Sequence, residues 1–83
     1  MVEQEIGTVI HYWDRIGVAG IRLSGTLRVG DTIHIAGATT DFTTTVQSIQ
    51  EEKRSLAEAG AGHSVGLKVP ERARPGDTVY KVE

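Results

Sequence analysis

Two short runs of this chain repeat one pattern, and they limit its fold more than any other feature. They are R-V-G-D-T-I at residues 28–33 and R-P-G-D-T-V at residues 74–79, 46 positions apart. A Gly-Asp pair favours a tight reversal of the backbone, and the Thr and β-branched residue that follow it favour an extended strand. We therefore expect two turns that each begin a strand.

The rest of the sequence predicts further short strands between turns. Ten glycines are scattered through it, and Thr, Val and Ile recur between them, a pattern typical of small β-proteins. Val46 and Ile49 are three positions apart, whereas side chains on one face of a strand repeat every two, so we expect a β-bulge between them, near residues 47 and 48. The expected strands are at residues 6–12, 18–23, 32–36, 42–50, 64–69 and 78–82.

Residues 51–59 allow two interpretations. The charges of residues 51–54 are typical of a solvated surface run, but they also fit the start of a helix that continues to Ala59. The apolar residues available to such a helix are Leu56, Ala57 and Ala59, which support no more than about one or two turns. The sequence therefore predicts no long helix here.

Six short strands without a long helix predict one all-β domain over residues 1–83. Among all-β folds they favour a small closed Greek-key barrel of six strands, because closure removes the exposed edges that so small a sheet would otherwise present. An SH3-like barrel and a five-stranded OB barrel are alternatives within the same class.

Composition excludes several classes of protein and site. The chain has no cysteine, so a disulfide framework and a thiolate metal site are both excluded, and a cytoplasmic location is favoured over a secreted one. No apolar run approaches the ~20 residues of a membrane helix, and the acidic N-terminus lacks an apolar signal segment. The net charge is −2, which argues against strong non-specific binding to nucleic acid.

Six ordered stretches of the chain carry a resemblance to a known family. In order and spacing they resemble domain 2 of the translational GTPases, such as elongation factor Tu and initiation factor 2, and they cover about nine-tenths of the sequence. The resemblance implies a closed six-stranded barrel that contacts transfer RNA or ribosomal RNA. The chain is also similar to free-standing translation-factor-like proteins and to a barrel appended to collagenase-like peptidases and RNA-modification enzymes. The stretches are residues 7–9, 17–23, 25–35, 46–49, 58–66 and 74–80.

The motifs of catalysis and of nucleotide or metal binding are missing. No G-x-x-x-x-G-K-[ST] pattern occurs, so we expect no GTP binding and no nucleotide cofactor. His11, His34 and His63 have no partners at metal-ligand spacing, and the many Thr and Ser hydroxyls are typical of strands rather than of nucleophiles. Asp31 and Asp77 are expected to hydrogen-bond their own turns. We therefore expect a domain that is not an enzyme and holds no metal or cofactor.

The best candidate site combines aromatic and basic side chains near the end of the first predicted strand. Tyr12, Trp13 and Arg15 lie there, and Trp13 is the only tryptophan. Aromatic faces stack on bases and guanidinium groups bind phosphate; the alternative is that Trp13 covers the barrel mouth while Tyr12 fills a groove. Arg72 and Arg74, with Lys68, form a second basic patch, for which the alternative is an ordinary solvated loop.

The sequence therefore predicts a non-catalytic binding module. It would contact transfer RNA, ribosomal RNA or a translation-related protein through five of these residues, Tyr12, Trp13, Arg15, Arg72 and Arg74. The alternative is a protein-docking accessory domain that acts in trans for an RNA-modification or peptidase-like enzyme, and the mildly acidic charge balance fits a protein partner. Salt separates the two, because RNA binding weakens steeply with ionic strength and apolar docking does not.

Overall fold

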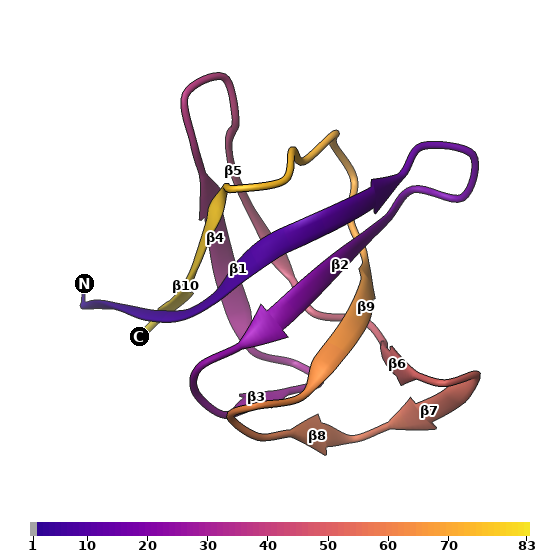
Figure 1. The fold of residues 1–83 in the computed structure, drawn as a ribbon. Coiled ribbons are helices and arrows are strands. Elements are labelled where there is room, and N and C mark those ends of the chain that lie inside the picture. Colours follow the sequence, from indigo (N-terminus) through magenta and orange to yellow (C-terminus); the bar gives the residue numbers. More distant parts are fainter. Residues whose placement is uncertain (1) are drawn as a thin grey trace.

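The computed structural model describes residues 2–83, and every helix or strand found in them is a β-strand (Figure 1). The predicted strands 18–23, 32–36 and 78–82 are confirmed with the same bounds. The first strand is longer than predicted and runs through Trp13. The strands are β1 (Glu3–Trp13), β2 (Val18–Leu23), β3 (Leu27–Arg28), β4 (Thr32–Ala36), β5 (Asp41–Thr45), β6 (Ile49–Glu51), β7 (Arg54–Leu56), β8 (Glu58–Ala59), β9 (Ser64–Lys68) and β10 (Thr78–Val82).

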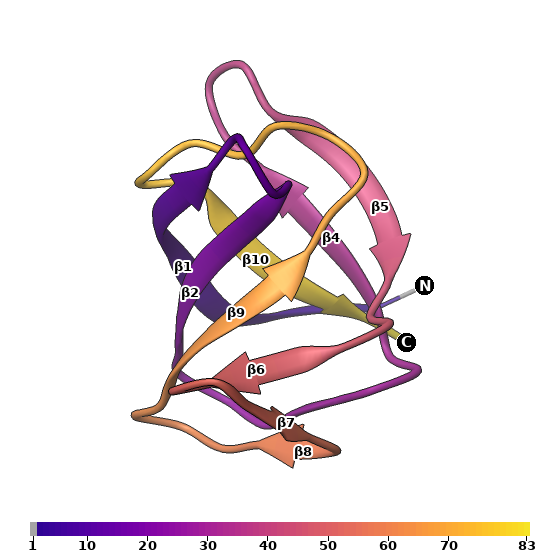
Figure 2. The ribbon, with the colours of Figure 1, turned by 90° about the vertical axis from the view of Figure 1, so that its right-hand side faces the viewer.

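Eight of these strands form one antiparallel sheet in the order β5-β4-β10-β1-β2-β9-β6-β7, and β3 pairs separately with β8. The sheet curls around a shared interior, as the side view shows (Figure 2). The prediction of an all-β chain is confirmed. Within residues 2–83 no ladder joins the two end strands, β5 and β7, so closure into a six-stranded barrel is not confirmed.

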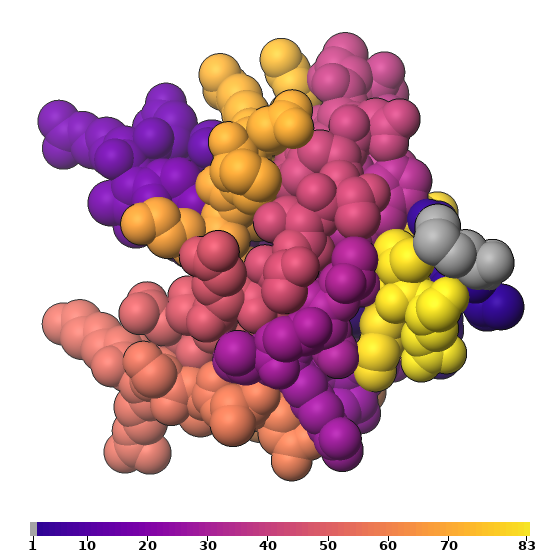
Figure 3. All heavy atoms as spheres, turned by 180° about the vertical axis from the view of Figure 1, so that it is seen from behind, coloured from indigo at the N-terminus to yellow at the C-terminus, as the bar shows by residue number. Residues whose placement is uncertain are grey.

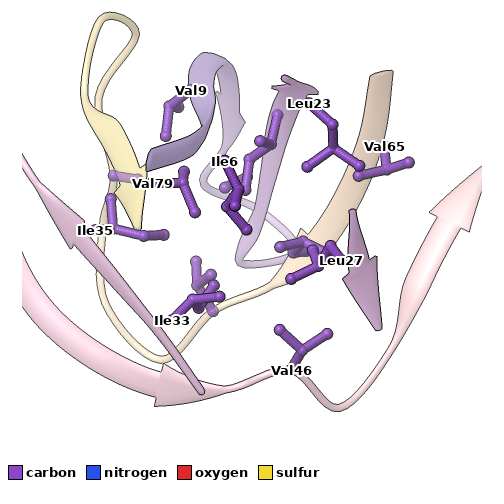
Figure 4. Packing of buried hydrophobic residues seen from close by; sticks show 14 of the residues in the cluster. Ile6, Val9, Leu23, Leu27, Ile33, Ile35, Val46, Val65 and Val79 are labelled. Carbon is purple, nitrogen blue, oxygen red and sulfur yellow. The ribbon is translucent and has the colours of Figure 1, made fainter. Parts of the chain in front are cut away.

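Apolar side chains from nearly every strand fill the interior of this curve (Figure 4). Strict alternation places them there: Ile33 and Ile35 of β4 are buried, as are Val65 and Leu67 of β9. Each fully buried aliphatic side chain contributes about 1.5–3 kcal/mol relative to an exposed one. The largest fully buried side chains are those of Ile6, Ile21, Leu27, Ile33, Ile35, Ile49, Leu67, Val9 and Val79.

The stretch predicted as one strand from residue 42 to residue 50 is two strands with different neighbours. β5 ends at Thr45 and pairs with β4, whereas β6 begins at Ile49 and pairs with β7 and β9. The predicted bulge is therefore wrong: the chain buries both Val46 and Ile49 by leaving one part of the sheet and entering another. Bulges occur instead in β1, where the register shifts twice.

Residues 51–59 are extended, so the helix interpretation is wrong. β6 and β7 form a hairpin whose turn residues, Glu52 and Lys53, both have positive φ angles of 49° and 67°. Two positive φ angles match the twist of a two-residue hairpin turn. Non-glycine residues in this region cost of order 1–3 kcal/mol each, and such strain is found mainly at functional sites.

The two repeated runs form the same turn. The Asp31 Oδ2 atom accepts a hydrogen bond from the backbone N–H of Arg28 at 2.9 Å, and Asp77 Oδ2 accepts one from Arg74 at 2.8 Å. The glycine before each Asp has a φ of 97°, a conformation that favours glycine. The prediction that both Asp side chains hydrogen-bond their own turns is confirmed.

Each turn is also fastened to a neighbouring strand in the same way. Val46 donates its N–H to the Asp31 carbonyl, and Val9 donates its N–H to the Asp77 carbonyl, both at 2.8 Å. The strands that follow the turns, β4 and β10, pair with each other, and His34 lies opposite Tyr80, 46 positions later. An approximate two-fold axis at this pair therefore relates β4 to β10 and β5 to β1.

Candidate functional site

Three of the five exposed large apolar side chains in residues 2–83 border one pocket. Ile10, Trp13 and Ile16 are 49%, 45% and 61% exposed, and they line a pocket of about 300 Å³ together with Val18. The opposite wall is formed by residues 50–53 at the β6–β7 turn. Figure 3 shows the surface hollowed between the purple β1–β2 turn and the coral β6–β7 turn. We call this pocket the apolar notch.

A bulge in β1 turns Trp13 toward the notch. Val9 pairs with Ile21 and His11 with Gly20, so Ile10 is the extra residue between them. If β1 were regular and Ile10 took an ordinary alternating place, Val9, His11 and Trp13 would all point into the core, because side chains alternate along a strand. With it, Val9 is buried while Trp13 lies on the outer face of the sheet.

Trp13 packs on the backbone of Gly20. A Cβ atom on Gly20 would lie 3.0 Å from Cζ3 and 3.1 Å from Cη2 of the indole. His11 contacts the same ring edge-on, with ring centroids 4.4 Å apart and planes 60° apart. The indole is thus positioned by its neighbours while nearly half of the residue stays exposed. It covers Gly20 on the outer face of β2.

A second pocket brings together three of the other predicted site residues. Tyr12, Arg72 and Arg74 line a pocket of about 400 Å³, with His11 and Asp14 beside them. Tyr12 is half-buried and packs against the core, whereas both arginines are exposed. No ion pair found within residues 2–83 involves either arginine. We call this second site the basic pocket.

The five predicted site residues are therefore divided between two places. Tyr12, Arg72 and Arg74 share the basic pocket, Trp13 lines the notch, and Arg15 is exposed in the β1–β2 turn and lines neither pocket. His11 lies between the two pockets, since it contacts Trp13 and borders the basic pocket.

Sequence reasoning missed the other members of the notch. Ile10 and Ile16 were not chosen, and neither were Gly20 and Gly66, which lie opposite each other on β2 and β9. A signal was present, because glycine inside a strand often marks a close approach of other groups. Here Trp13 approaches Gly20, and a Cβ on Gly66 would lie 3.2 Å from Cγ1 of Val18.

A third cluster lies on the outer face of β1, β4 and β5. His34 Nδ1 lies 3.0 and 3.1 Å from the two carboxylate oxygens of Glu3, and Nε2 lies 2.5 Å from Asp41 Oδ1. The hydrogen bond with Asp41 has the largest effect and the hydrogen bond with Glu3 the second largest, and both raise the pKa of His34 above its ordinary value of 6.5. Burial lowers this pKa by a smaller amount. The His34 side chain is 22% exposed.

In the part of the chain that the structure describes, no group of three or more His, Cys, Asp or Glu side chains is arranged to hold a metal ion. Both histidines with side-chain hydrogen bonds, His34 and His63, bond to carboxylates and not to a hydroxyl.

Nothing helical between residues 2 and 83 has the length and apolar character needed to cross a bilayer.

The sequence matches known proteins over most of its length. The family model of elongation factor Tu domain 2 matches residues 17–80. An uncharacterized protease of Methanocaldococcus jannaschii is 39% identical over 77 residues, which are 92% of this chain and 19% of that protein. A collagenase of Porphyromonas gingivalis is 35% identical over 80 residues, 94% of this chain and 22% of the enzyme. The chain thus spans about a fifth of the length of these relatives.

Solved structures share the fold. The C-terminal domain of a Geobacillus thermoleovorans protein assigned to the U32 peptidases has a TM-score of 0.91 at 24% identity and covers 96% of this chain and 93% of that domain. The initiation factor aIF5B of Aeropyrum pernix has a TM-score of 0.64 at 20% identity and covers 95% of this chain and 14% of the factor.

Proposed function

The chain belongs to the elongation factor Tu domain 2 family, and we propose that it is a non-catalytic docking domain for a peptidase-like protein. The fold alone does not decide the partner, because one fold serves many functions. The relatives above 30% identity are a protease and a collagenase of which this chain matches about a fifth. We assign the peptide-cleaving chemistry of such proteins to the other four-fifths, and to this chain the task of docking against it.

The observation that carries the proposal is the convergence of Ile10, Trp13 and Ile16 on the apolar notch. Tryptophan is enriched among the residues that dominate protein–protein binding, where it fills desolvated sites at the centre of an interface. An exposed, positioned indole beside two exposed isoleucines fits the apolar surface of a protein partner. The two isoleucines beside the indole have no counterpart in the binding of a phosphate backbone, which charged groups dominate.

The opposite wall of the notch supports the same function. Glu52 and Lys53 border the notch and hold positive φ angles that non-glycine residues adopt at a cost. The turn they form projects beside the notch (Figure 3). We infer that this turn forms the second side of the docking surface.

Contact with transfer or ribosomal RNA through the basic pocket is the second candidate function. Arg72 and Arg74 are exposed and free of ion pairs within residues 2–83, and Tyr12 lies beside them. A guanidinium group without a partner is suited to a phosphate oxygen. This candidate does not involve the notch, so the two functions are separable by mutation.

The absence of cysteine supports a cytoplasmic location for either function.

We also propose that the domain closes into a six-stranded Greek-key barrel in solution. Two hydrogen bonds bracket β5: Gly37 donates its N–H to the Thr40 carbonyl, and Val46 donates its N–H to the Asp31 carbonyl. Backbone groups along an antiparallel strand point alternately toward and away from the partner strand. Residues 41, 43 and 45 of β5 therefore direct their N–H and C=O groups away from β4. Closure would give these groups partners. Slow amide exchange at the three residues would support a closed barrel, and exchange as fast as in the turns would exclude it.

Calorimetric titration separates docking from RNA binding. The probes are the Methanocaldococcus jannaschii relative without its matching segment, shown to be folded by circular dichroism, and bulk transfer RNA. We expect binding to the protein probe to change little between about 50 and 200 mM salt, the range over which RNA complexes weaken strongly. Ile16→Ser should weaken it about tenfold or more.

The matched control is Val29→Ser, because Val29 is also exposed (45%) but lies outside the notch. It should bind as the unmodified chain does. Binding of transfer RNA alone, lost in Arg72→Ser with Arg74→Ser and unaffected by Ile16→Ser, would replace the docking proposal with the RNA candidate.

A further inference from the structure

We propose that Glu3, His34 and Asp41 form a proton-dependent clamp, which ties the start of β1 and the edge strand β5 together across β10 and opens when His34 loses a proton. The clamp is independent of both pockets. It lies at the approximate two-fold relation between β4 and β10, where His34 is opposite Tyr80.

Geometry places a carboxylate at each nitrogen of one imidazole. His34 Nδ1 is 3.0 Å from Glu3 Oε2, and Nε2 is 2.5 Å from Asp41 Oδ1. Glu3 belongs to β1 and Asp41 to β5, which do not pair with each other, since β4 and β10 lie between them. The histidine is therefore the side-chain link between two strands that the backbone ladder joins only indirectly.

The chemistry of the three groups requires two protons on the ring. An ionised carboxylate only accepts hydrogen bonds, so each nitrogen must donate an N–H. Imidazole has two N–H groups only in its cationic form; neutral imidazole would face one carboxylate with a lone pair. Loss of one proton therefore turns one of the two contacts from attractive to repulsive.

Among residues 2–83, no cation faces this ring that would take over its role. Across the sheet, His34 faces Thr43 on β5 and Tyr80 on β10, whose ring centroid is 6.0 Å away. Glu5 on β1 pairs with Tyr80 and adds a third carboxylate to this face. The ammonium group of Lys81, the nearest cation on β10, lies 3.4 Å from Asp31. The charges facing the ring are therefore all negative, in agreement with the raised pKa of His34.

The two contacts differ in exposure, and this sets which one opens. The Asp41 side chain is 83% exposed and that of Glu3 is 38% exposed. Water competes more strongly with the more exposed contact. When His34 becomes neutral, we expect it to keep its Nδ1–H for Glu3 and to release Asp41, which frees the end of the β4–β5 hairpin.

The chain contains its own controls. His63 contacts one carboxylate, Glu51, through Nδ1 alone, so a neutral ring with Nδ1–H keeps that contact. His11 contacts the Trp13 ring. Only His34 has carboxylates at both nitrogens among the hydrogen bonds found within residues 2–83.

The experiment is a titration of all three histidines by two-dimensional NMR of the intact chain, with the ¹⁵N shifts of both ring nitrogens. We expect the His34 midpoint to lie above 6.5, with both ring nitrogens of the protonated type below that midpoint. Asp41→Asn and Glu3→Gln should each lower this midpoint, because each removes a carboxylate that favours the charged ring, and the double variant should lower it further.

Amide exchange tests the opening itself. Above the His34 midpoint, the amides of Phe42 and Thr44, the β5 residues whose backbone groups face β4, should exchange faster than the pH dependence of intrinsic exchange explains, and this excess should be absent in Asp41→Asn. Three results would each overturn the clamp: a His34 midpoint at or below 6.5, the ordinary value, midpoints unchanged in both variants, or equal excess exchange in Asp41→Asn.

Discussion

The carboxylate of Asp77 occupies the place where a side chain on Gly37 would begin. A Cβ atom built on Gly37 would lie 1.9 Å from Asp77 Oδ1, and Asp77 is only 5% exposed. The other oxygen, Oδ2, accepts the Arg74 N–H at 2.8 Å. One buried carboxylate thus holds its own turn and fixes the residue type in the loop after β4.

We predict that Gly37→Ala lowers the free energy of unfolding by about 2 kcal/mol or more, because the methyl group and the buried carboxylate cannot share the same space. Urea denaturation measures the change. Gly60→Ala is the matched control, since a Cβ there meets nothing within 4 Å and Gly60 has no positive φ. An equal loss in both variants would contradict the close approach.

The two equivalent turns should differ in their contribution to stability. Asp31 and Asp77 make the same backbone hydrogen bond, but the Asp31 side chain is 20% exposed and Asp77 is almost fully buried. Asp77→Ala leaves the part-buried Arg74 N–H without its acceptor, which costs about 2–3 kcal/mol, whereas the Asp31 hydrogen bond is exposed, so water can reach the N–H in Asp31→Ala and limits the loss to about 1 kcal/mol. Denaturation midpoints with equal m-values would show the order.

Local signals were enough to predict the turns and most strands. The two Gly-Asp runs and the alternation of Ile33 and Ile35 act over a few residues, so the sequence alone identified the turns and the bounds of β4 and β10. The family motifs likewise indicated domain 2 of translation factors, which the match over residues 17–80 confirms.

Features that depend on which strands pair with each other could not be predicted from the sequence. The spacing of Val46 and Ile49 indicated an irregularity, but only the tertiary fold decides between a bulge and a change of partner strand, and the latter occurs. The β6–β7 hairpin was missed because Glu52 and Lys53 lack the usual turn chemistry of positive φ. Tertiary pairing overrides local propensity there.

The candidate site was predicted in part for the same reason. Tyr12, Trp13, Arg72 and Arg74 were chosen by residue type, and that choice does not show which of them meet. Alternation along β1 places Tyr12 and Trp13 on opposite faces of the sheet. The bulge at Ile10 makes Trp13 the one that faces outward, and no local pattern marked that bulge. Whether these residues bind a partner stays a prediction.

The stability of the fold should depend on pH through His34. Its pKa is raised in the folded state by Asp41 and Glu3, so its contribution is complete below the unfolded value of about 6.5 and is lost as the pH rises through the folded value. The difference in unfolding free energy between the unmodified chain and His34→Gln should therefore shrink as the pH is raised from about 6 toward about 9. A difference that grows over this window would contradict the assigned direction.

Gly20→Ala should move the indole more than it destabilises the fold. The new methyl group would meet the far edge of the Trp13 ring, at 3.0–3.1 Å, and an exposed ring can shift by a few tenths of an ångström. We expect a change in stability below about 1 kcal/mol with a clear shift in Trp13 fluorescence, which is specific because the chain has one tryptophan. Unchanged fluorescence would show that the ring does not rest on Gly20.

Trp13 also provides the most direct test of docking through the apolar notch. Labelled as 5-fluorotryptophan, it gives one ¹⁹F signal, which is followed while the Methanocaldococcus jannaschii relative without its matching segment, or transfer RNA, is added. The account predicts that the protein shifts the signal and protects it from solvent, and that Ile16→Ser abolishes this response while Val29→Ser preserves it. A signal that ignores the protein and moves only with transfer RNA would contradict it.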